Sequence, residues 1–90
     1  MRYSEMIRTA INNSGMKLET ISELVDLKIG TKPSIYYLSR IQNGKVPPAG
    51  EKLNIALSQI LNIDYTDLRL AAYKEKIPND VLEQLINETA

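Results

Sequence analysis

Apolar residues recur at the three- and four-residue spacing of an α-helix along most of this 90-residue chain, and no run alternates apolar and polar residues as a β-strand does. Glycine, proline and asparagine interrupt the pattern at short intervals, so each helix is expected to be short. The strongest apolar stripe lies in residues 51–61. We therefore predict an all-α fold, a bundle of five short helices followed by a sixth at the C-terminus.

The expected helices span residues 4–14, 17–28, 35–43, 51–61, 65–74 and 79–88. Ser4 and Asp64 are predicted to cap the first and fifth helices, because their side-chain oxygens can accept hydrogen bonds from the free amides of a first turn. We expect one small domain at 1–76 and a helical extension at 77–90. The apolar side of that extension either folds back on the core or pairs with a second copy of the chain, which would make the protein a homodimer.

The chain contains no cysteine and no histidine. Disulfides, the usual zinc sites and any mechanism that needs a histidine base or a cysteine nucleophile are therefore excluded. Nothing in the sequence suggests a nucleophile with its base or a phosphate-binding glycine loop, so we expect no enzyme activity, no cofactor and no metal. No apolar run approaches the roughly 18 residues of a membrane span, and no signal peptide is evident, so a cytoplasmic protein is expected.

The formal net charge is zero, but the charges are unevenly distributed. Residues 1–50 carry seven basic and four acidic side chains, a net charge of +3, and residues 51–90 carry the opposite excess. Within residues 27–50 there are four basic side chains and no acidic one. A neutral protein is not an obvious nucleic-acid partner, yet this stretch offers positive charge without nearby negative charge in the sequence.

The acid-free stretch contains a helix with a clear start and a clear stop. Ser34 follows a proline and is a favourable N-cap, and Gly44 suits the left-handed residue that ends many helices. Helical spacing turns Leu38 and Ile41 inward. The same spacing turns a polar, positively charged set of side chains outward: Tyr36, Ser39, Arg40 and Asn43. We expect Tyr37 to be half-buried, and the outer side of the helix to contact a polar, anionic partner.

Three segments carry a resemblance to a known family: residues 37–45, which include the pattern Ser-Arg-Ile-x-x-Gly-Lys, the prolines at 47–48, and the amphipathic run at 53–64. Residues 14–22 add a glycine turn into the second helix. From about residue 5 to residue 73 the chain resembles the phage-repressor-like (Cro/cI-type, Xre) helix-turn-helix family. That resemblance implies a lambda-repressor-like fold and a repressor, of phage or mobile-element type, that binds double-stranded operator DNA in the major groove, commonly as a dimer on an inverted repeat.

Matching the family's motif to this chain implies a set of DNA-contacting residues. The base-facing positions fall on Ile35, Tyr36, Ser39 and Arg40, and the phosphate-facing positions on Asn43 and Lys45. Arginine pairs well with guanine O6 and N7, which suits Arg40. Lys28, Lys32 and Lys45 are expected to neutralise phosphates.

The chain departs from the family in three places. The connector between Ile21 and Ser39 is several residues longer, so either the second helix is extended or residues 28–33 form a loop. Gln42 stands where the family usually has glutamate, and Ser22 where it usually has alanine; a small buried hydroxyl is tolerable at that position if it bonds back to its own helix. The alternative function is a protein-interaction module, an antitoxin or antirepressor that binds a protein partner.

Overall fold

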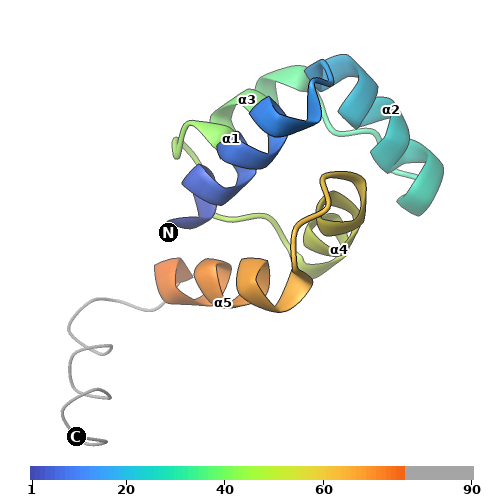
Figure 1. Cartoon of the computed structure of the whole chain (residues 1–90). Coiled ribbons are helices and arrows are strands. Elements are labelled where there is room, and N and C mark those ends of the chain that lie inside the picture. Colours follow the sequence, from blue (N-terminus) through green and yellow to red (C-terminus); the bar gives the residue numbers. More distant parts are fainter. Residues whose placement is uncertain (77–90) are drawn as a thin grey trace, which may run out of the picture.

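The computed structural model describes residues 1–76, which form five helices and no strand (Figure 1). The helices are α1 (Tyr3–Ser14), α2 (Leu18–Ile29), α3 (Ile35–Gln42), α4 (Glu51–Ile60) and α5 (Tyr65–Lys76). The all-α prediction is confirmed for this part of the chain. The predicted helix at 79–88 lies outside the described residues. Within residues 1–76 no helix is long and apolar enough to span a membrane.

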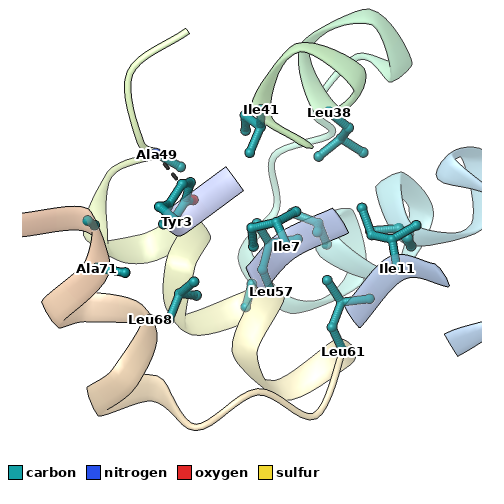
Figure 2. Packing of buried hydrophobic residues seen from close by; sticks show 14 residues of the cluster. Tyr3, Ile7, Ile11, Leu38, Ile41, Ala49, Leu57, Leu61, Leu68 and Ala71 are labelled. Atoms are coloured by element: carbon teal, nitrogen blue, oxygen red, sulfur yellow. Dashed lines mark hydrogen bonds between the residues drawn. The ribbon is translucent and has the colours of Figure 1, made fainter. Parts of the chain in front are cut away.

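The helices pack in pairs around one apolar core. α4 contacts α2 and α5, α1 contacts α3 and α5, and α2 contacts α3. Each helix contributes at least one side chain that is at most 1% exposed: Ile7, Ile21, Ile41, Leu57 and Leu68. Figure 2 shows four of these, Ile7, Ile41, Leu57 and Leu68, converging from different helices. Because α3 uses only one side for this packing, its other side is left accessible.

All but one of the predicted helix ends in residues 1–76 lie within one residue of the observed ends, and the exception is the end of α5, two residues later than predicted. Gly15 follows α1 with a left-handed φ of 69°, and Asn62 adopts φ 56° after α4. The amide of Asp67 donates to the side chain of Asp64 at 3.0 Å, so Asp64 caps α5 as predicted. The prediction for Ser4 is wrong: α1 begins at Tyr3, and Arg2 occupies the N-cap position without a side-chain bond.

Tyr3 explains why α1 begins earlier than predicted. Its side chain is 2% exposed and belongs to the core, which requires the first turn to include it. Its hydroxyl donates to Asn54 Oδ1, and the Ala49 amide donates to the same hydroxyl at 3.3 Å (Figure 2). Asn54 Nδ2 in turn donates to the Ala49 carbonyl at 2.9 Å. This polar triangle joins α1, the loop before α4, and α4, and it satisfies the polar atoms that it buries.

Candidate nucleic-acid interface

α3 has well-defined ends. The Ser34 hydroxyl accepts a hydrogen bond from the Tyr37 amide at 3.0 Å, as predicted for an N-cap. At the other end the Gly44 amide donates to the Ile41 carbonyl and the Lys45 amide donates to the Arg40 carbonyl, at 3.2 and 2.9 Å. These two bonds form a Schellman motif, with Gly44 at φ 69° as the left-handed residue. Capping bonds at both ends therefore define α3 as a helix of eight residues.

Five side chains form a continuous strip on α3, here called the outer face of α3: Ile35, Tyr36, Ser39, Arg40 and Asn43. Their positions span less than half of the helix circumference at 100° per residue. Tyr36 is 71% exposed and Ile35 is 42% exposed. On the opposite side, Leu38 and Ile41 are buried and Tyr37 is half-buried, as predicted.

Arg40 does not extend freely into solvent. Its Nη1 donates to the Tyr36 hydroxyl at 3.1 Å, and its Nη2 donates to the Lys45 carbonyl at 3.3 Å. Its guanidinium carbon also lies 5.3 Å from the centroid of the Tyr36 ring, within cation–π range. A guanidinium has five N–H donors, so three remain for an external acceptor. The side chain is therefore directed by its neighbours and still able to donate.

Ser39 and Asn43 lie between these groups and are themselves paired. The Asn43 amide nitrogen is 3.4 Å from the Ser39 hydroxyl, to which it donates. Asn43 also occupies the C-cap position, with φ −97°. Its side chain thus combines a local role at the end of α3 with exposure on the outer face.

The connector before α3 combines both alternatives raised by the sequence. α2 continues through Lys28 to Ile29 and ends at Gly30, which has φ 73°, and a short segment then leads to Ser34. The buried Ser22 hydroxyl is satisfied by donating to the Pro33 carbonyl, and not by a bond within its own helix. The connector therefore turns back along α2, and α3 begins beside the middle of α2 (Figure 1).

This course separates the three predicted phosphate-binding lysines. Lys28 lies on the last turn of α2, about 9 Å along the axis beyond Ser22 at 1.5 Å per residue. Lys32 lines a recess together with Glu19, Glu23 and Ile35, so two acidic residues share that recess with it. Lys45 is exposed and directly follows the Schellman glycine of α3. Of the three, Lys45 is the one joined most directly to the outer face of α3.

Arg8 is a basic residue beside α3 that the sequence did not indicate. It lies on α1, is exposed, and its Nε donates to the Gln42 carbonyl at 3.1 Å. It thereby places a third positive charge at the C-terminal end of α3, with Arg40 and Lys45. The sequence shows only that Arg8 is charged. Its contact with Gln42 could not be predicted, because that contact depends on how α1 packs against α3.

The chain matches no model of a known protein family, no curated protein and no solved structure. Among the residues that the structure describes, no group of three or more histidine, cysteine, aspartate or glutamate side chains is arranged to hold a metal ion.

Proposed function

We propose that this protein is a sequence-specific double-stranded DNA-binding regulator, a repressor that acts by occupying an operator. The observation that supports the proposal is the outer face of α3, on which Ile35, Tyr36 and Asn43 are exposed and Ser39 and Arg40 are half-buried, so that none of them belongs to the core. It belongs to the only long stretch of the chain without an acidic residue, 27–50.

The dimensions of α3 suit this role. An α-helix with side chains is about 10–12 Å across, and the major groove of B-DNA is about 12 Å wide. The base edges there present acceptors, donors and the thymine methyl group, which match the chemistry of Arg40, Ser39 and Ile35. Lys45 and Arg8, at the end of the helix, provide charges for the phosphates that flank the groove.

The zero net charge limits the non-specific part of binding. Each phosphate that a basic side chain neutralises contributes about one unit to the slope of affinity against salt on logarithmic axes. With two basic side chains, Arg8 and Lys45, positioned for phosphates at the end of α3, we expect a slope of about −2 for one monomer, and twice that for a dimer on an inverted repeat. Binding that does not change between low and physiological salt would contradict this electrostatic account.

Selection of bound sequences from a random pool of duplex DNA tests the proposal. We expect an enriched inverted repeat, whose half-site spacing also reports whether the protein binds as a homodimer. The control is the Arg40→Ala variant, which should enrich the same sequence weakly or not at all. A wild-type protein that enriches no sequence at low salt would refute the proposal.

A second candidate is a protein-interaction module, such as an antitoxin or antirepressor. It is favoured by large apolar side chains that the described residues leave exposed, among them Leu27 at 83% and Leu70 at 55%. Because such a protein can also bind its own promoter, DNA binding alone does not separate the two. A toxin gene beside this one, and a stable complex of the two purified products, would favour the interaction module.

A further inference from the structure

A groove, here called the methionine groove, runs along α1 and is bounded first by the end of α4 and then by α5. All three methionines of the chain line it: Met1, Met6 and Met16. The part beside α4 has no lysine, arginine, aspartate or glutamate in its lining, which includes three apolar residues: Ala10, Ile60 and Ile63. The part beside α5 passes over Leu70 to Lys74. Met1 and Met6 line both parts, so the two form one groove.

The methionine groove presents apolar surface that the described residues do not cover. Met1 is 80% exposed and Leu70 is 55% exposed. Met6, Ala10 and Ile63 are half-buried and pack against the core from below. Methionine side chains are unbranched and flexible, so they adapt to the shape of an inserted apolar surface. A groove of this kind suits the apolar side of an amphipathic helix.

The groove faces away from the outer face of α3. Arg8 is the α1 residue that donates to the Gln42 carbonyl of α3. At 100° per residue, Met6 and Ala10 each lie about 160° around α1 from Arg8. An occupant of the groove therefore leaves the outer face of α3 accessible, and its presence does not depend on whether α3 binds DNA.

The chain itself carries an amphipathic segment next to this groove. In residues 79–88, four apolar side chains fall within about 140° of a helix: Val81, Leu82, Leu85 and Ile86. The six polar residues of the segment fall on the remaining side. α5 ends at Lys76, close to the N-terminus of the chain, where Arg2 Nε lies 3.8 Å from Glu75 Oε1 (Figure 1). The segment therefore begins near the Lys74 end of the groove.

The lengths of the segment and of the groove agree. A helix of ten residues is about 15 Å long, and α5 from Lys74 back to Tyr65 measures about 13.5 Å. Pro78 opposes a continuation of α5 in the same direction. The chain from Lys76 to Asn79 spans up to about 10 Å, which matches the 8–10 Å between the axes of packed helices. A return along α5 is therefore within reach.

We propose that residues 79–88 return antiparallel to α5 and bind in the methionine groove of the same chain, with Leu82 beside Leu70. The sequence leaves two occupants open for the apolar side of this segment, the core of the same chain and a second copy. The groove favours the same chain, because a connection of two residues keeps the segment at a high effective concentration beside it. Its polar side then faces solvent.

The first test is thermal unfolding of the full chain. Leu85→Asp places a charge on the apolar side of the segment, and Gln84→Asp places the same charge on its polar side. We expect Leu85→Asp to lower the Tm by about 4–8 °C, as a modest loss of packing does in a domain of this size, and Gln84→Asp to leave it nearly unchanged. Equal Tm values for wild type and both variants would overturn the proposal.

The second test identifies the occupant by a disulfide. Because the chain has no cysteine, the double variant Leu70→Cys with Leu82→Cys contains a single pair. A disulfide needs Cα atoms about 4.4–6.8 Å apart, so we expect oxidation to link this pair within one chain. The control replaces Leu70 with Arg69, which is exposed about 100° around α5 and does not line the groove. Arg69→Cys with Leu82→Cys should stay reduced.

Non-reducing electrophoresis and peptide mass mapping distinguish the outcomes of the second test. A disulfide within one chain, formed with Leu70→Cys and not with Arg69→Cys, supports the proposal. A disulfide between two chains would assign the groove to a second copy and overturn it. Equal linkage of both pairs, or of neither, would mean that the segment has no fixed place beside Leu70, which also overturns it. None of these outcomes bears on DNA binding, so the proposed function is tested separately.

Discussion

The hydroxyl of Ser22 in α2 donates a hydrogen bond to the carbonyl oxygen of Pro33, eleven residues later and one residue before the N-cap of α3. Ser22 is 1% exposed, so the bond forms away from bulk solvent. The bond fixes the start of α3 beside the middle of α2, even though α2 continues to Ile29 before the connector turns back. The direction of α3 therefore depends on a side-chain contact more than on the length of the connector.

Ser22→Ala should lower the free energy of unfolding by about 1 kcal/mol, because it leaves the Pro33 carbonyl without this donor. It should also reduce affinity for the selected DNA more than affinity for random DNA, since α3 becomes less well oriented. Urea denaturation and anisotropy titrations measure the two effects. The matched control is Ser58→Ala, which removes a buried hydroxyl that bonds only within α4. Equal effects of both variants on specific binding would contradict the orienting role.

Gly44→Ala should destabilise the protein by roughly 1 kcal/mol, because alanine is strained at φ 69°. A Cβ atom there would also lie 3.3 Å from the Ser4 hydroxyl, so the Ser4 side chain would have to move by a few tenths of an ångström. Gly30→Ala is the control: it meets the same strain at φ 73° but has open space around it. Thermal unfolding should show the larger loss at Gly44. A larger loss of stability in Gly30→Ala than in Gly44→Ala would mean that the close contact with Ser4 costs little.

Tyr3 should make stability fall steeply at high pH. Burial raises the pKa of the Tyr3 hydroxyl from 10.0 to about 12. Below pH 10 both the folded and the unfolded chain keep this proton, so the stability is fully present. Between pH 10 and 12 the unfolded chain loses the proton first, and linkage predicts a loss of up to about 3 kcal/mol.

Other tyrosines and lysines titrate in the same range, so Tyr3→Phe provides the reference for this pH effect. The variant should be less stable near neutral pH, because Ala49 and Asn54 lose a partner, by about 1–3 kcal/mol. The difference in unfolding free energy between wild type and variant should then shrink from pH 10 to pH 12. A difference that stays constant would rule out Tyr3 as the titrating group.

Lys45→Ala should weaken binding to specific and random DNA by a similar factor and reduce the salt slope by about one unit. Lys28→Ala, with the same loss of charge, should change the slope less, because Lys28 lies at the far end of α2 from α3. Anisotropy titrations between 50 and about 200 mM salt measure both slopes. Equal reductions of the salt slope in the two variants would contradict this prediction and would mean that the bound DNA also contacts the end of α2.

Local patterns predicted the features of the fold that depend on a few neighbouring residues. Ser34 and Asp64 cap the N-termini of α3 and α5 with their side chains, and Gly44 ends α3 with a left-handed backbone, as their residue types predicted. The fifth helix was placed at 65–74 and runs to Lys76, a difference of two residues at a boundary.

The features that were missed depend on contacts between distant elements. Ser4 is the better N-cap by type, but the burial of Tyr3 moves the start of α1. Ser22 and Asn54 are polar residues in the core, and no periodic pattern indicates that Pro33 and Tyr3 satisfy them. For the candidate site, helical spacing identified the outer face of α3, whereas the contact of Arg8 with Gln42 and the separation of Lys28 from α3 required the packing of the helices.

The bond between Tyr3 and Asn54 joins positions 51 residues apart. During synthesis on a ribosome, the first turn of α1 therefore emerges long before its partner exists, while α2 and α3 have each other as near neighbours in the sequence. Contacts close in sequence form at a lower entropic cost than those that close a long loop. We accordingly expect the N-terminal turn, although first to be made, to be among the last parts of the domain to acquire protection from hydrogen exchange.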